Sequence, residues 1–132
     1  MEEALIKRVL PHSIEAEQSV VGAMLMDKEA IMTASEIISG EDFYQTTYGV
    51  VFGAIVELYN EGKPVDLITL QDRLREKDVP EEIQSLEFVR ELLTSVSTSA
   101  NVKYYADIVA EKSMLRKLIR LTEGNYGRFN QG

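Results

Sequence analysis

Apolar residues recur every three or four positions along most of the chain, which is the spacing of an amphipathic helix. No turn-bounded segment of four or more residues alternates between apolar and polar side chains at the period of two that marks a half-buried strand. We therefore expect an all-α fold, namely a compact orthogonal bundle of about six helices.

Capping and turn residues divide this pattern into separate helices. Pro11 disfavours helix in the residue before it, and Ser13 is well placed to cap a first helix that ends at Asp27. A second helix is expected over about residues 28–38, with Gly40 as the left-handed residue that ends it.

The third expected helix is the most apolar one. It is capped by Thr46 or Thr47 and ends before Gly62, and it is apolar on more than one face, so we expect it at the centre of the bundle. Gly49 and Gly53 form a G-x-x-x-G step within it, which allows a second backbone to approach closely. Packing within the chain is the favoured interpretation, and a dimer contact is the alternative.

Two shorter helices are expected next. The fourth is capped by Asp66 or Thr69 and ends at residues 78–80, and the fifth opens at Ser85. Residues 94–99 hold five Ser or Thr side chains and one Val, so we expect a loop there.

The last expected helix runs from about residue 100 to residue 122. Its apolar period drifts, so part of it should project past the body of the bundle. The expected organisation is a lead-in over 1–10, a globular head over 11–99, a projecting segment over 100–123 and a frayed tail over 124–132.

Composition supports one packed domain in a reducing compartment. The 132 residues are 45% hydrophobic and 27% charged, which is close to the globular average. The absence of cysteine excludes disulfides, thiolate metal sites and cysteine nucleophiles. The longest apolar run, residues 50–56, is too short to span a membrane, and the first ten residues lack the apolar middle of a secretory signal. We expect a cytoplasmic protein.

Charge is distributed unevenly along the chain. Residues 1–102 carry 8 basic and 19 acidic side chains, whereas residues 103–132 carry 6 basic and 3 acidic ones, for a net charge of −8 overall. A chain of this kind is a poor autonomous nucleic-acid binder. The basic segment is also amphipathic, and either a partner helix covers its apolar stripe or the helix folds back on the core. The side chains concerned are Lys112, Leu115, Arg116, Lys117, Leu118, Ile119 and Arg120.

No independent catalytic or cofactor site is expected. The chain lacks both glycine-rich phosphate-binding patterns, and His12 has no second histidine or cysteine with which to bind a metal. We expect His12 to be a surface residue. The carboxylate pairs lie at helix starts or in loops, where solvation keeps them from acid–base catalysis. These pairs are Glu15 with Glu17, Glu41 with Asp42, and Glu81 with Glu82.

Four separated blocks resemble one known family. Residues 11–20, 41–44, 64–70 and 100–118 look like the amino-terminal domain of the bacterial replicative DNA helicase, DnaB type. The resemblance covers about residues 10–121. One departure is Gln84-Ser85, where the family often has a Gly-Gly turn, so the loop geometry at that point is an open question.

The resemblance implies a domain that precedes a RecA-like motor, and that motor is absent from this sequence. ATP and magnesium are expected only in the motor. Family members form hexameric collars from a globular head and a helical hairpin, and the collar receives primase and a helicase loader. By analogy, the helix from residue 100 begins the hairpin. We expect a weak dimer from this chain, a hexamer from the full-length protein, and little direct DNA binding.

Four residues are the expected partner contacts. Glu15 is an exposed carboxylate near a helix start, Phe88 lies on the polar side of the fifth helix, and Leu115 and Ile119 belong to the projecting stripe. The alternatives are cap electrostatics for Glu15, core packing for Phe88 and packing within the hairpin for Ile119.

Two other classes of function remain open at this point. A free-standing helical adaptor or loader-binding protein would have a stop codon where a helicase has a downstream Walker A loop. A small helical enzyme would show hydrolase activity that survives purification.

Overall fold

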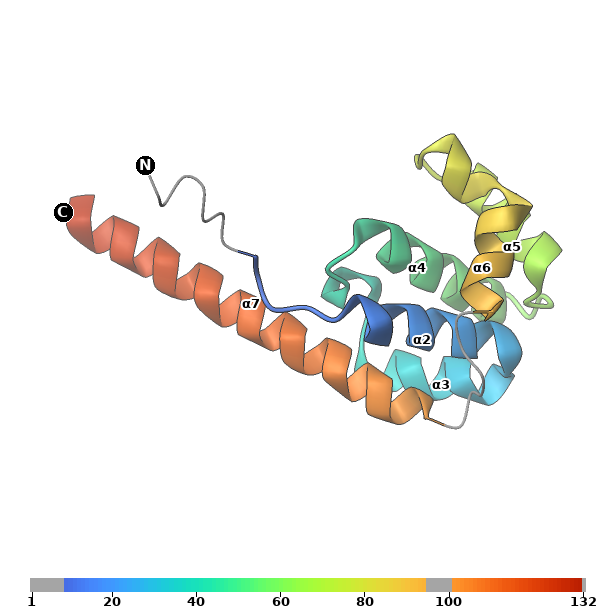
Figure 1. Ribbon diagram of the computed structural model, residues 1–132, viewed down its shortest axis with the longest axis horizontal. Helices are drawn as coiled ribbons and strands as arrows, with labels where there is room; N and C mark the ends of the chain where they lie inside the picture. Colours follow the sequence, from blue (N-terminus) through green and yellow to red (C-terminus); the bar gives the residue numbers. More distant parts are fainter. Residues whose placement is uncertain (1–8, 95–100, 132) are drawn as a thin grey trace.

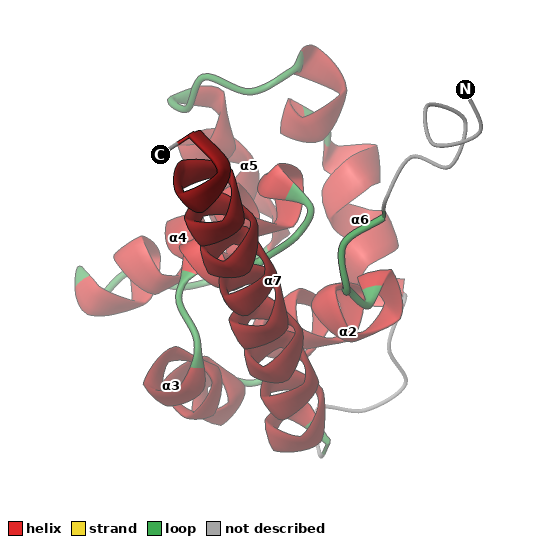
Figure 2. Ribbon diagram, turned by 90° about the vertical axis from the view of Figure 1, so that its left-hand side faces the viewer, coloured by secondary structure: helices red, strands yellow, loops and turns green. Residues whose placement is uncertain are grey.

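The computed structural model describes residues 9–94 and 101–131, with side chains described as far as Glu123. Every regular element within these ranges is a helix (Figure 2), which confirms the expected all-α fold. The α-helices are α2 (Ile14–Met26), α3 (Lys28–Ile37), α4 (Thr46–Asn60), α5 (Leu67–Arg75), α6 (Leu86–Thr94) and α7 (Val102–Gln131), with 3-10 helices η1 (Gly40–Asp42) and η2 (Glu81–Gln84).

Helices α2 to α6 form a head from which α7 projects (Figure 1). The first half of α7 packs against α2 and α3, and its second half extends alone beyond the head. This arrangement confirms that the last helix outruns the body of the bundle.

Two helices share the centre of the head, namely α2 and the apolar α4 that was expected there. Helix α2 packs against α3, α4, α6 and α7. Small side chains at Ala16, Ser19, Gly22 and Ala23 are all buried, and they let neighbouring helices approach α2 from several sides. The most apolar helix, α4, packs against α2, α3, α5 and η1.

Three of the expected helix caps are present. The Ser13 hydroxyl accepts a hydrogen bond from the third amide of α2 at 3.2 Å. The Asp66 carboxylate accepts from two amides of α5, and the Thr69 hydroxyl accepts in return from the Asp66 amide at 2.9 Å. Ser85 accepts from an amide of α6 at 3.1 Å. The threonine cap expected for α4 is wrong, because Thr46 is already helical and the cap residue Gln45 makes no side-chain capping bond.

Two glycines bring the backbones of η1 and α4 together. A Cβ atom added to Gly49 would lie 2.4 Å from the carbonyl oxygen of Gly40, so only glycine fits there. Gly40 is not left-handed; among the described residues only Gly62 has a positive φ, of 74°. Gly53, the other half of the G-x-x-x-G step, has open space over it. Of the two glycines in this step, only Gly49 makes a close backbone contact, and that contact lies within the chain.

Several helix ends differ from the expected ones. Helix α5 ends at Arg75, before the expected end at residues 78–80. The 3-10 helix η2 ends at Gln84, where this sequence differs from the Gly-Gly turn of the family. Most of the expected loop over 94–99 lies outside the described residues. The frayed tail from Gly124 is not observed, because α7 continues to Gln131. Two isolated glycines cost only about 1 kcal/mol each in a helix, and no proline follows to stop it.

An ion-pair cluster joins the end of α4 to α5. Arg73 donates to Glu57 at 3.0 Å and to Glu61 at 2.7 Å, and Lys77 donates to Glu57 at 2.7 Å. Arg73, followed by Lys63, lowers the pKa of Glu61 to about 2. The cluster lies on the surface, so it orients α5 more than it stabilises the head.

Candidate partner-docking site

One face of α7 is buried from Val102 to Arg116, and its chemistry changes where the helix leaves the head. The buried positions follow a spacing of four and three residues, so they share one face: Val102, Ala106, Val109, Ser113 and Arg116. The first three are apolar and pack into the core, whereas the last two are polar. From Ser113 onward, hydrogen bonds replace apolar contacts as the link between α7 and the head.

Arg116 is the centre of this link, which we call the Arg116 clamp: Arg116 and Ser113 with Pro11 and Asp42. The Arg116 side chain is only 4% exposed. Its guanidinium donates to the carbonyl oxygen of Pro11 at 2.9 Å and to that of Asp42 at 2.6 Å. The Ser113 hydroxyl donates to the Asp42 carboxylate at 2.7 Å. The clamp thus ties α7 both to Pro11, in the segment that precedes α2, and to η1.

The Asp42 carboxylate is held in its charged form by its donors. It accepts from the Ser39 amide at 2.8 Å and from the Lys117 ammonium at 3.4 Å, in addition to Ser113. Burial alone would raise the pKa of Asp42, but the Ser113 and Ser39 hydrogen bonds and the charge of Lys117 together lower it below its ordinary value. Asp42 therefore remains an acceptor for α7 at neutral pH.

Glu17 is a buried carboxylate, and the expectation that it would be solvated is wrong. It is 1% exposed and accepts from the backbone amides of Tyr44 at 2.7 Å and Gln45 at 3.1 Å. Gln45 is the cap residue of α4 and makes no side-chain capping bond itself, so Glu17 provides an acceptor for the cap amide and for the amide before it. Burial lowers the pKa of Arg116, and the charges of Glu17 and Asp42 oppose that shift.

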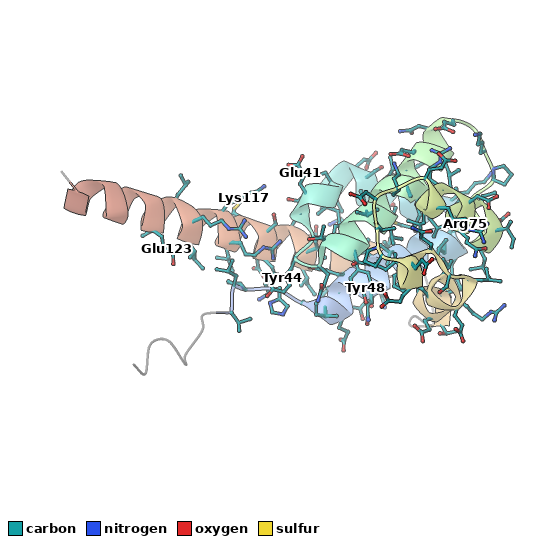
Figure 3. All side chains as sticks on the ribbon, turned by 90° about the horizontal axis from the view of Figure 1, so that it is seen from above. Glu41, Tyr44, Tyr48, Arg75, Lys117 and Glu123 are labelled. Carbon is teal, nitrogen blue, oxygen red and sulfur yellow. The ribbon has the colours of Figure 1, made fainter. Side chains whose placement is uncertain are left out.

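Tyr44 connects His12, just before α2, to the clamp. The His12 ring stacks on the Tyr44 ring with centroids 3.9 Å apart, and the Arg116 guanidinium lies 5.6 Å from the Tyr44 centroid. His12 is half-buried and its Nδ1 lies 2.7 Å from the Leu10 carbonyl oxygen, so it is not the plain surface residue expected. Figure 3 shows Lys117 on α7, and Tyr44 beside that helix, where α7 leaves the head.

The face of α7 opposite the clamp is apolar and exposed. Four large apolar side chains on it are between 39% and 63% exposed: Met114, Leu115, Leu118 and Leu121. Folding back of α7 on the core therefore does not cover this stripe, because the face that packs on the head is the one that carries Arg116. We call these four residues the apolar face of α7. Exposed apolar surface of this kind marks an interaction site.

The expected partner contacts lie on separate parts of the molecule. Glu15 is exposed at the start of α2, Leu115 belongs to the apolar face of α7, and Ile119 is half-buried beside it. Phe88 is half-buried and packs against the core, so its expected position on the polar side of α6 is wrong. Helix α6 lies at the opposite end of the molecule from the projecting part of α7 (Figure 1). The structure does not gather these residues into one surface.

The clamp was missed by sequence reasoning, although one signal for it exists. Ser113 and Arg116 continue the register that Val102, Ala106 and Val109 set, so helical geometry alone places them on the buried face. A polar pair at such positions predicts buried hydrogen bonds. No comparable local signal shows that Glu17 is buried.

The described residues offer neither a membrane-spanning helix nor a metal-binding cluster. The helices of residues 9–94 and 101–131 include none with the length and apolar character that crossing a bilayer requires. The same residues contain no cluster of three or more His, Cys, Asp or Glu side chains with metal-binding geometry.

Comparisons with known proteins agree with this geometry. Residues 9–111 match the family model described as the DnaB-like helicase N terminal domain. The chain is 46% identical over 120 residues to the replicative DNA helicase DnaB of Geobacillus stearothermophilus and 41% identical to the replicative DNA helicase DnaC of Bacillus subtilis. Each match covers 91% of this chain but 26% of the relative, so the chain spans about a quarter of the length of these relatives.

Solved structures show the same fold. The crystal structure of the N-terminal domain of DnaB helicase from Mycobacterium tuberculosis matches with a TM-score of 0.89 at 35% identity, covering 94% of this chain and 88% of that one. The N-terminal domain of DnaB helicase from Helicobacter pylori, whose interactions with primase are described with its structure, matches with a TM-score of 0.74 at 18% identity over 88% of this chain and 90% of that one. The chain belongs to the family of DnaB-like helicase N-terminal domains.

Proposed function

We propose that this chain is the assembly and docking module of a replicative DNA helicase, and that it carries out no chemistry itself. The observation that carries this proposal is the apolar face of α7, which the Arg116 clamp holds pointing away from the head. In this proposal the ATP- and magnesium-dependent motor belongs to the remaining three quarters of the relatives' length.

Self-association of the chain alone should be weak. Complete burial of a large apolar side chain is worth about 1.5–3 kcal/mol, and the apolar face offers four such side chains that are already partly covered. Association costs about 4–15 kcal/mol in lost freedom before any affinity appears. We therefore propose a weak dimer for this chain, and a hexameric ring only with the further contacts of a full-length protein.

Primase and a helicase loader are the proposed partners. The Helicobacter pylori relative has reported interactions with primase, and its fold is shared by this chain. The exposed Glu15 and the Ile119 edge of α7 are the proposed contacts for primase. Direct DNA binding should be slight, because the chain carries a net charge of −8.

Sedimentation velocity over about a hundredfold range of concentration tests the self-association proposal. We expect a monomer–dimer equilibrium that Leu118→Glu abolishes. Ile68→Glu is the matched control, because Ile68 is similarly exposed, on α5 of the head. A tight hexamer, or equal sensitivity to both substitutions, would contradict the proposal.

Titration with the carboxyl-terminal domain of primase tests the docking proposal. We expect saturable binding that Glu15→Ala and Ile119→Ala each weaken. Glu29→Ala is a matched control, because Glu29 is an exposed carboxylate in the first turn of α3 as Glu15 is in α2. Binding that is indifferent to both test substitutions would reject this surface.

A further inference from the structure

A small polar cavity of about 130 Å³ lies beside the Arg116 clamp, between α7 and the segment 41–44. Three cations of α7 line it, Arg116, Lys117 and Arg120, together with the Glu41 carboxylate and the Tyr44 ring. Pockets for drug-sized ligands start at about 300 Å³, so this cavity has room for one small group only.

The three cations are incompletely neutralised. Arg116 hydrogen-bonds two neutral carbonyl oxygens and forms no direct ion pair within the described part of the chain, and the charges of Glu17 and Asp42 act on it without hydrogen-bonding it. Arg120 also has no ion pair with any described residue, and its charge acts on Arg116 from close by. Lys117 reaches Asp42 only at 3.4 Å and remains 66% exposed on its side chain. An anion in the cavity would attract all three cations and reduce their mutual repulsion.

We propose that this cavity binds the phosphate group of a small, freely diffusing molecule. Guanidinium and ammonium groups are the usual protein ligands of phosphate, and here they approach it from two successive turns of one helix. The cavity admits one group, and the net charge of −8 disfavours a long polyanion, so a free phosphate or mononucleotide fits better than a nucleic-acid backbone. This inference stands independently of the proposed function.

The wall of the cavity also contains an opposing charge. Glu41 is exposed and lines the same space as the cations, so it should weaken the binding of any anion. Its removal should therefore tighten phosphate binding. Saturation and the confinement of the response to the cavity residues separate a site from general attraction of anions to the cations.

Titration of the isotope-labelled chain with inorganic phosphate, at constant ionic strength set with chloride, tests the proposal by NMR. We expect saturable amide shifts confined to residues 41–44 and 113–120, with a dissociation constant on the order of 1 mM. Arg120→Gln and Lys117→Gln should each weaken binding by about tenfold, and Glu41→Gln should strengthen it several-fold. Lys103→Gln is the control, because Lys103 is an exposed cation of α7 that does not line the cavity.

Mononucleotide and oligonucleotide arms distinguish the sources of the phosphate. Adenosine monophosphate should shift the same amides as inorganic phosphate. An oligodeoxynucleotide that binds more tightly per phosphate would overturn the assignment to a small molecule. Shifts that do not saturate, or that persist unchanged in the Arg120 and Lys117 variants, would show that the cavity binds no phosphate.

Discussion

The replacement Arg116→Met should destabilise the protein far more than the neighbouring replacement Lys117→Met. Methionine keeps most of the apolar stem of the arginine but removes both hydrogen bonds of the clamp. The carbonyl oxygens of Pro11 and Asp42 then lose a charged donor at a site where Arg116 is only 4% exposed. Lys117 has two-thirds of its side chain in solvent and contacts Asp42 only at 3.4 Å.

The expected magnitude follows from these contacts. A hydrogen bond to a charged group contributes about 1.5–3 kcal/mol, so the two together contribute about 3–6 kcal/mol. Part of this gain is offset, since burial lowers the pKa of Arg116 and so disfavours its charge. We expect Arg116→Met to lower the free energy of unfolding by about 2–4 kcal/mol. For Lys117→Met we expect a change within about 0.5 kcal/mol.

Urea unfolding of both variants measures this difference, and a second measurement addresses the direction of α7. The chain has no cysteine, so spin labels can be placed at two introduced cysteines, at Glu87 on α6 and Thr122 on α7. Arg116→Met should broaden the distance distribution between them, whereas Lys117→Met should leave it narrow. Equal stabilities and equal distributions for the two variants would refute the clamp as the device that orients α7.

Three further predictions concern packing, capping and pH. Gly49→Ala should destabilise the protein by about 2 kcal/mol or more, because the added methyl group meets the Gly40 backbone. Gly53→Ala should stabilise the protein by about 0.5–1 kcal/mol, because alanine favours a helix and has open space there. Thermal unfolding of both variants shows whether the two effects have opposite signs. Glu17→Gln should cost about 1–2 kcal/mol and speed hydrogen exchange of the two amides it caps. The pKa of Asp42 is lower in the folded state than the ordinary value of 3.8. The Asp42 carboxylate therefore stabilises the fold at pH values above 3.8, and this stabilisation is lost as the pH falls through the lower pKa of the folded state. Asp42→Asn should flatten that part of the profile of unfolding free energy against pH.

Local chemistry made much of the fold predictable. Ser13, Asp66 and Ser85 cap helices as expected, because each cap bonds to amides two or three residues further along the chain. The cap expected at Thr46 or Thr47 is wrong, and the amide of the actual cap residue of α4, Gln45, is bound by Glu17, which lies 28 residues away. Patterns along the sequence reveal caps that are local and miss caps supplied by tertiary contact.

The site was predictable only in part. The exposed apolar stripe follows from the positions of Leu115 and Leu118, because a helix that outruns its head leaves such side chains uncovered. Phe88 was misplaced, since its neighbours in sequence do not show which side of α6 meets the core. The burial of Glu17 depends on the approach of Tyr44 and Gln45, which no spacing within α2 encodes.

The change from apolar to polar contacts at Ser113 has a directional consequence for the docking face. Val102, Ala106 and Val109 set the rotation of the first turns of α7 by packing into the core, but these apolar contacts end before the helix leaves the head. The Arg116 guanidinium extends this constraint to the point of exit, because it must point at two fixed carbonyl oxygens. Each residue turns a helix by about 100°, so Leu118 and Met114 then face away from the head. A buried polar clamp at the point of exit is therefore what makes the direction of the exposed apolar face specific.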